Sequence, residues 1–384
     1  MTATQESPAD AATKVRVIDA DGHVMESFST WPQYLPAHIR DEVVALQTSV
    51  IMPGGTGADD ALAAIDDAGP EAVAANPGAD PEGQTRMFIE GGWDPTARLT
   101  DMDAEGMDVA VLYPTLLLGV LPDAGLFAQS CRAYNDWLRD YCATDPARLV
   151  GVAVIPFQDV EASVAEARRA VEQLGFRAIM IRPVAYLDGT MLYDPMYGPL
   201  WRTAVELGVG IGVHPFPFPD LPDICRAMNL ARGMRFPQDN ITLRQGLSNA
   251  LDVMMALGYF VAGGICERFP DLQVAFLEGS GGWLPSMLER LEHHFHIFGS
   301  ELQRTSPTEL FKRQCYISFD PDEYGLPHTA AFIGADRILW ASDYPHPDAK
   351  IPGTVAELRE AIRPMATSDQ ALVLGANAAR FYGL

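Results

Sequence analysis

The chain has 384 residues, of which 48% are hydrophobic, and its mean hydropathy of +0.02 fits a soluble globular protein with a large core. The formal charge of −24 argues against nucleic acid or an anionic membrane as a partner, because both require positive patches. The five cysteines include no Cys-x-x-Cys pair, so neither a disulfide framework nor a thiolate zinc site is expected.

The first 14 residues are polar and rich in alanine, and they lack the apolar segment of a secretory signal. We expect residues 1–14 to be a flexible N-terminus and residues 15–384 to form a single domain. No uninterrupted apolar run is long enough for a transmembrane helix. We therefore expect a cytoplasmic protein.

From residue 15 onward, short apolar runs alternate with longer amphipathic segments. Eight runs have the length and composition of strands, namely Val15–Ala20, Val109–Tyr113, Leu149–Ile155, Ala178–Arg182, Val209–Val213, Gln273–Leu277, Cys315–Phe319 and Ile338–Ala341. Helical patterns lie between them, namely Gly125–Thr144, Val160–Leu174, Tyr197–Leu207, Leu251–Arg268, Leu284–Phe298 and Val355–Met365. Eight strands that alternate with helices predict an α/β fold, a (β/α)8 TIM barrel rather than an open sheet.

Two long stretches interrupt the alternation, residues 32–95 after the first strand and residues 216–248 after the fifth. The first is rich in Ala, Gly, Asp and Pro, and the second contains several prolines. Both leave the carboxyl ends of strands, where a barrel carries its active site. Because long loops are often functional, we interpret both as lids or pocket walls, with solvated decoration as the alternative.

Polar side chains follow four of the predicted strands. Asp21 and His23 come after the first strand, and residues two apart in extended chain project to the same face. His214 follows the fifth strand, Glu278 the sixth and Asp343 the eighth. Each alone is explained as a turn, capping or core residue. Together, at the ends of strands one, five, six and eight, they favour one shared site.

Several motifs support a family resemblance, namely Asp19–Glu26, Val213–Phe216, Gly264–Val274, Leu277–Pro285, Trp340–His346 and Asn377–Leu384. With these the chain resembles the amidohydrolase superfamily. The similarity is to the amidohydrolase-related group that includes aminocarboxymuconate semialdehyde decarboxylase and γ-resorcylate decarboxylase.

The resemblance implies a metal held by Asp21, His23, His214 and Asp343. Two imidazoles and two carboxylates suit one divalent ion, with zinc as the first expectation and manganese as the second. Relatives with two metals use a lysine at the fourth strand. Here that strand ends at Arg182 and no lysine lies near it, so we expect one ion.

Two departures from the group concern Asp21 and Glu278. The family often has His-x-His or Glu-x-His in the first strand, where this chain has Asp-x-His. The group's decarboxylases usually carry an acid/base histidine at the position of Glu278. A glutamate there is expected to move a proton, as is Asp343, or to bind the metal directly.

Further residues near these strand ends are candidates for substrate binding. Arg182 would hold a substrate carboxylate in a charge-assisted pair, and a structural ion pair is the equal alternative. Trp283 would form an aromatic wall, with plain packing as the alternative. His346 would contact the metal ligands and orient them without binding the metal itself.

Three functional classes remain open. The first is a metal-dependent lyase that decarboxylates a small aromatic or unsaturated carboxylic acid. The second is a hydrolase or hydratase in which Glu278 activates metal-bound water. The third, an inactive metal-binding scaffold, is disfavoured by the intact ligand set. Decarboxylation is the leading hypothesis, and apolar surface at residues 258–267 and 293–298 predicts a homodimer or larger homo-oligomer.

Overall fold

The computed structural model describes residues 15–26, 30–51, 90–230, 241–299, 301–346, 349 and 351–384. The expected flexible N-terminus and the middle of each predicted insertion lie outside these ranges. The strands are β1 (Ile18–His23), β2 (Val109–Tyr113), β3 (Leu149–Gly151), β4 (Ala153–Val154), β5 (Ala178–Ile181), β6 (Gly210–Val213), β7 (Val274–Phe276), β8 (Cys315–Phe319) and β9 (Ile338–Trp340).

All the strand pairs are parallel, in the order β1-β2-β3 and β4-β5-β6-β7-β8-β9. Only Val152 separates β3 from β4, and its amide donates to Leu112 of β2 at 3.2 Å. The two strands therefore occupy one position in the barrel, which accounts for the single predicted strand Leu149–Ile155.

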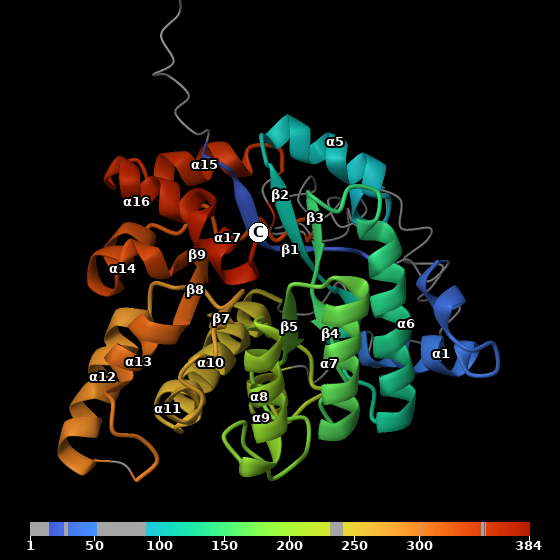
Figure 1. Ribbon diagram of the computed structural model, residues 1–384, viewed down its shortest axis with the longest axis horizontal. Helices are drawn as coiled ribbons and strands as arrows, with labels where there is room; N and C mark the ends of the chain where they lie inside the picture. The colour runs from blue at the N-terminus through green and yellow to red at the C-terminus, as the bar shows by residue number, and fades with distance from the viewer. Residues whose placement is uncertain are drawn as a thin grey trace, which may run out of the picture.

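The ring closes through the residues that follow β9. The amide of His23 donates to the carbonyl of Tyr344 at 2.7 Å, and the amide of Asp343 donates to that of Asp21 at 3.3 Å. With eight parallel strand positions and helices outside them, the chain is a (β/α)8 barrel (Figure 1), as the sequence predicts.

The first strand lies three residues further along the chain than predicted. It includes Asp21 and His23, and its pairing with β2 is irregular between Asp19 and Gly22. The reason is that residues 21–23 have backbone partners on both sides, Tyr113 of β2 and the segment after β9. Asp21 and His23 therefore lie inside the carboxyl end of a buried strand rather than after it.

The helices surround the strands (Figure 1). Those of at least eight residues are α1 (Arg40–Ile51), α5 (Pro95–Glu105), α6 (Ala124–Cys142), α7 (Val160–Leu174), α8 (Gly198–Leu207), α10 (Ile241–Val261), α12 (Leu284–Phe298), α13 (Pro307–Gln314), α14 (Leu326–Ile333) and α15 (Thr354–Ala361). Shorter ones are α9 (Ile224–Ala227), α11 (Ile265–Arg268), α16 (Thr367–Ala371) and α17 (Asn377–Tyr382). Side-chain caps start several of them, as where Asp159 accepts from the Ala162 amide at the start of α7.

Both predicted insertions contain helix. In the first, α1 begins at Arg40, and in the second α10 begins at Ile241 rather than at Leu251. The polar residues Thr242, Gln245 and Asn249 interrupt the apolar pattern of α10 in its first three turns, which is why the sequence pattern placed its start too late.

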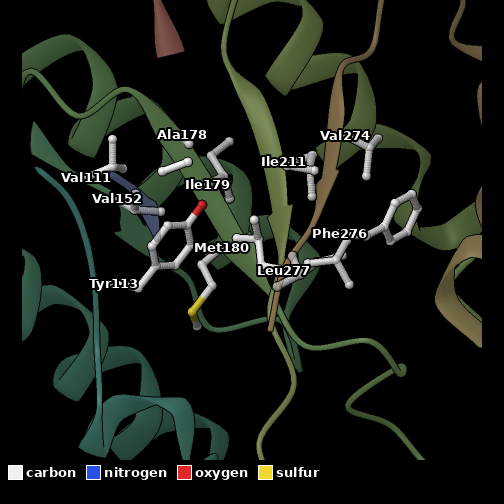
Figure 2. Close-up of a cluster of buried hydrophobic side chains, with 14 of the residues drawn as sticks. Val111, Tyr113, Val152, Ala178, Ile179, Met180, Ile211, Val274, Phe276 and Leu277 are labelled. Carbon is white, nitrogen blue, oxygen red and sulfur yellow. The ribbon is translucent and has the colours of Figure 1, made fainter. Parts of the chain in front are cut away.

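The barrel core contains apolar side chains and a pair of tyrosines. Figure 2 shows part of this core, with side chains from β2, β5, β6 and β7. The Tyr113 hydroxyl lies 3.0 Å from that of Tyr382 in α17, which donates to the carbonyl of Ala20 at 2.7 Å. A Cβ at Gly212 would lie 2.3 Å from the Tyr113 hydroxyl, so only glycine leaves room for this ring. Tyr113 forms the floor beneath the strand ends.

The segment Thr242–Arg268 has the length and hydropathy of a membrane span, and 61% of its most apolar window is buried inside the fold. A core helix has the same composition. All five cysteines are free and buried, and they pack as small apolar side chains.

Candidate metal centre

Five polar side chains from four strand ends converge above Tyr113. Asp21 and His23 close β1, His214 follows β6 directly, and Glu278 and Asp343 lie two and three residues beyond β7 and β9. Residue exposure is 1% or less for the first three. We call this group the metal centre, and the positions of its members match the strand ends that the sequence singled out.

The two histidines turn lone pairs toward each other. Nδ1 of His23 lies 2.7 Å from the carbonyl of Pro114, and Nδ1 of His214 lies 2.7 Å from that of Pro215. A carbonyl only accepts, so in each neutral ring Nδ1 carries the proton and Nε2 is free to bind a cation. The two Nε2 atoms are 3.2 Å apart.

Carboxylate oxygens surround this pair of nitrogens. Nε2 of His23 lies 3.7 Å from Oδ1 of Asp21 and 3.3 Å from Oδ1 of Asp343. Nε2 of His214 lies 3.7 Å from Oδ2 of Asp21 and 2.9 Å from Oε2 of Glu278. Oδ1 of Asp21 is buried and accepts no hydrogen bond from the described residues.

The electrostatics of the centre reflect its burial. Burial raises the pKa of Asp21 to about 8, with His214 lowering it and Glu278 raising it. Burial, together with His346 and His214, holds the pKa of His23 well below its ordinary value. Burial also opposes protonation of His214, but Asp21 and Glu278 outweigh it and the pKa of His214 is raised. Carboxylates in this position need protons or a cation.

A divalent cation fits this arrangement. One ligand atom each from Asp21, His23 and His214 lies within 4.8 Å of the others, and the same holds for His23, Asp343 and His346. In the first group the lone pairs of Asp21, His23 and His214 converge, and Oδ1 of Asp21 accepts no hydrogen bond from the described residues. A metal ion satisfies such a group of acceptors. Two imidazoles with carboxylates suit a borderline divalent ion.

Glu278 forms one wall of the centre and has an unusual backbone. Its φ is +44°, in the left-handed region, as is that of Asp343 at +54°. The second oxygen of Glu278, Oε1, accepts from Nδ2 of Asn249 at 3.0 Å and from Nε2 of Gln245 at 3.5 Å. Glu278 therefore has one oxygen on the centre and the other on helix α10.

Asp343 is supported by His346, as the sequence anticipated for this histidine. Nδ1 of His346 lies 2.6 Å from Oδ1 of Asp343, and Nε2 lies 2.9 Å from the hydroxyl of Thr115. The His346 ring also lies against His23, with centroids 4.1 Å apart. Thr115, which the sequence did not single out, thus ties the end of β2 to the loop after β9.

Arg182, predicted either to bind a substrate carboxylate or to form a structural ion pair, is engaged in buried ion pairs in the structure. Its buried guanidinium pairs with Asp220 at 2.9 Å and with Asp223 at 3.1 Å. The same terminal nitrogens donate to the carbonyls of Leu118 and Phe216. The alternative, a structural ion pair at the barrel rim, describes this geometry.

Trp283 is half-buried at the start of α12 and packs against the core. Its indole nitrogen donates to the carbonyl of Gly279 at 2.7 Å, across the turn that follows Glu278. The structure shows no contact between this ring and the five side chains of the metal centre, so a role in substrate binding stays a prediction.

The sequence patterns missed Asn249 and Gln245, because α10 was predicted to begin after them. Their spacing of four residues places them on one face of a helix, so an earlier helix start would have indicated that they act together. Both contact Glu278.

A family model described as amidohydrolase matches residues 18–384. The chain is 26% identical over 297 residues to 2-amino-3-carboxymuconate-6-semialdehyde decarboxylase of Dictyostelium discoideum, covering 76% of this chain and 77% of that one.

Two solved structures show the same fold. An amidohydrolase from Mycobacterium avium subsp. paratuberculosis superposes with a TM-score of 0.74 at 20% identity, covering 97% of this chain and 100% of the other. A dihydroxybenzoic acid decarboxylase from Polaromonas, with bound manganese and the inhibitor 2-nitroresorcinol, gives 0.65 at 17% identity, covering 96% and 97%.

Proposed function

Because the chain belongs to the amidohydrolase family, we propose that it is a metal-dependent enzyme that decarboxylates a small aromatic or unsaturated carboxylic acid. The observation that carries the proposal is the convergence of His23 and His214, with Nε2 atoms 3.2 Å apart, among the carboxylates of Asp21, Asp343 and Glu278. Relatives of both sequence and fold are decarboxylases of such acids.

The proposed ligands of one divalent ion are Asp21, His23, His214 and Asp343. When bound, such an ion neutralises the buried carboxylates and polarises a substrate carboxylate and an oxygen beside it. Manganese in the Polaromonas decarboxylase and the oxygen-rich ligand set favour manganese as much as zinc. The absence of lysine from the end of β5, which stops at Ile181 before Arg182 and Pro183, favours one ion over two.

Decarboxylation of an aromatic acid needs a proton on the carbon that loses CO2. Glu278 is the proposed acid, because its Oε2 lies 2.9 Å from Nε2 of His214. From this position Glu278 would pass a proton to the substrate carbon as the carbon–carbon bond breaks and CO2 leaves.

Asp343 is the second proposed proton carrier. Its 2.6 Å contact with Nδ1 of His346 keeps Oδ1 oriented while that oxygen also lies 3.3 Å from His23. His346 is a positioning residue in this scheme, and Thr115 fixes its ring from the other side.

Water chemistry is the competing function, since a glutamate is also a suitable general base. A hydrolase or hydratase would use Glu278 to take a proton from water instead of giving one to carbon. The decarboxylases among the relatives favour the first assignment.

The test is a substrate screen on protein whose metal content has been measured. Hydroxybenzoates and muconate-type acids are incubated with protein loaded with Mn²⁺ or Zn²⁺, and CO2 release and hydration or hydrolysis products are followed together. Stoichiometric CO2 with one of these acids supports the proposal. Products that retain all their carbon, without CO2, would overturn it in favour of water chemistry.

We also propose that the enzyme is a homo-oligomer. Ile297 and Phe298 at the end of α12 are 57% and 76% exposed, and Leu302 beyond it is 52% exposed. A second copy of the chain would bury these apolar side chains. Light scattering of the wild type and of Phe298→Ser tests this, and a monomeric wild type would refute it.

A further inference from the structure

A buried arginine contacts both of the segments that bring carboxylates and His23 to the metal centre. Arg98 lies near the start of α5 and is 1% exposed, and its Nη1 donates to the carbonyl of His23 at 2.8 Å. Its guanidinium also lies over the ring of Tyr344, with 4.1 Å between Cζ and the ring centroid. Arg98 therefore bridges the end of β1, which carries Asp21 and His23, and the segment after β9, which carries Asp343.

A buried aspartate joins the same two segments. Asp19 of β1 has no exposed surface. Its Oδ1 accepts from the amide of Ser342 at 2.9 Å and from the amide of Asp21 at 3.3 Å. Its Oδ2 accepts from the hydroxyl of Ser342 at 2.6 Å. Since Ser342 directly precedes Asp343, Asp19 ties the backbone of one proposed ligand to the residue before another.

The side chains of Arg98 and Asp19 meet at Gly22, between the proposed ligands Asp21 and His23. Nη2 of Arg98 lies 4.0 Å from Oδ2 of Asp19. A Cβ at Gly22 would lie 2.6 Å from each of these two atoms. Glycine at this position therefore lets the ion pair lie directly against the strand that carries the two ligands.

The contacts with the ligand residues are made to their backbone, at the carbonyl of His23 and the amide of Asp21. They leave the ligand atoms of the side chains available and fix where those atoms lie. One distance that depends on this bridge is the 3.3 Å between Nε2 of His23 and Oδ1 of Asp343. Loss of an outer contact that orients a ligand typically costs about 10- to 100-fold in metal affinity.

We infer that Arg98 and Asp19 are positioning residues of the metal centre, which hold the ligands of β1 and Asp343 at the separation that one divalent ion requires. Neither side chain is itself a proposed ligand. The inference rests on the proposed function for its metal site, and it adds the residues that keep that site assembled.

Charge and position make opposite predictions for Arg98. Removing a cation from the neighbourhood of a metal site should strengthen metal binding by charge alone, because like charges repel. Removing the contact that orients His23 should weaken metal binding. The sign of the change in Arg98→Met therefore separates the two effects.

The test measures dissociation constants for Mn²⁺ and Zn²⁺ with the full-length protein, by competition with a chelator of known affinity. We expect Arg98→Met to weaken binding about 10- to 100-fold. Arg98→Lys, which keeps the charge but not the planar guanidinium, should lie between the methionine variant and the wild type. Ser342→Ala removes a hydrogen bond to Asp19 without changing any charge, and it should weaken binding about five- to tenfold.

Arg169→Met is the matched control. Arg169 is also a buried arginine, 9% exposed, and it pairs with Glu166 and Asp136 on α7 and α6. Its loss should lower stability while metal affinity stays at the wild-type value. The electron paramagnetic resonance spectrum of bound Mn²⁺ at saturating metal gives a second readout, since its zero-field splitting reports ligand geometry. That splitting should change in Arg98→Met and not in Arg169→Met.

Unchanged or tighter metal binding by Arg98→Met would overturn the inference, as would an equal loss of affinity in Arg169→Met. If Arg98→Met does not fold, Arg98→Lys and Ser342→Ala decide, and wild-type affinity in both would overturn it. The expected ranking in a protein that releases no CO2 from any acid would support the positioning role and count against the proposed reaction.

Discussion

Two buried clusters of charged groups lie at carboxyl ends of the barrel strands, and they differ in how those groups are satisfied. At Arg182, guanidinium donors meet the carboxylates of Asp220 and Asp223. At the metal centre, the imidazole Nε2 atoms of His23 and His214 meet, among the described residues, each other and carboxylates. Burial of charge is common to both. The metal centre has an excess of acceptors and therefore requires a cation, whereas Arg182 supplies a positive charge to its two carboxylates, although its Nε atom has no hydrogen-bond partner among the described residues.

The largest expected effect is the loss of metal from His214→Ala. Removing one of two nitrogen ligands leaves an incomplete site, so metal content should fall from about one ion per chain to near none, and activity should fall to background. Elemental analysis of protein purified without added metal measures this. Two tightly held ions per wild-type chain, or full occupancy in the variant, would contradict the proposed centre.

Glu278→Gln should retain metal and lose turnover. Glutamine keeps the shape and the hydrogen bonds to α10 but does not transfer a proton, so kcat should fall by roughly 10²–10⁴. Single-turnover kinetics with measured metal content check this. Lowered metal occupancy would instead identify Glu278 as a metal ligand. Full activity with full metal occupancy would rule out both roles, proton donor and ligand.

Arg182→Met should affect stability rather than metal content or KM, in contrast to His214→Ala and Glu278→Gln. It leaves Asp220 and Asp223 buried without their cation, which should lower the free energy of unfolding by about 3–5 kcal/mol. Metal content and KM should be unchanged. Chemical denaturation and steady-state kinetics measure the two quantities, and a tenfold rise in KM at unchanged stability would return Arg182 to substrate binding.

The smallest effect concerns Glu26, a third buried carboxylate, which is satisfied by backbone. It accepts from the amides of Thr115, Leu116 and Leu117. Burial raises its pKa to about 7, and these hydrogen bonds only partly offset the rise. The folded state then binds more protons than the unfolded state between pH 4.5 and pH 7, so stability should fall as the pH rises through this window and level off above it.

The contribution of Glu26 should amount to about 3 kcal/mol at most. Glu26→Gln should flatten that part of the stability curve, measured by denaturation at several pH values. The exposed Glu161→Gln is the matched control. A stability curve of Glu26→Gln that still falls as steeply as that of the wild type would assign the pH dependence to other groups.

The barrel and the positions of the strand-end residues were accessible from sequence, because each depends on local pattern. Apolar runs end at His214 and Glu278 in both prediction and structure, and parallel strands bring their carboxyl ends together. The role of Arg182 was not accessible. Its partners Asp220 and Asp223 lie in an irregular segment far from Arg182 in the sequence. An ion pair between residues so far apart in the chain leaves no pattern in the local sequence.

The contacts of α10 were missed for a related reason. Asn249 and Gln245 are polar residues near the start of a helix whose apolar face becomes regular only further on. Hydrophobic periodicity therefore overlooks helical turns whose polar side chains contact a site residue, as these two contact Glu278.

At Glu278 and Asp343, stability and function favour different residues, because both have a left-handed backbone. A side chain with a β-carbon in this conformation costs about 1–3 kcal/mol, and glycine has no such cost. Replacing either residue by glycine would remove both the strain and a carboxyl group of the metal centre. A population of variants selected only for heat resistance would therefore drift toward glycine at these two positions and lose its chemistry, whereas selection for turnover would hold both acids in place.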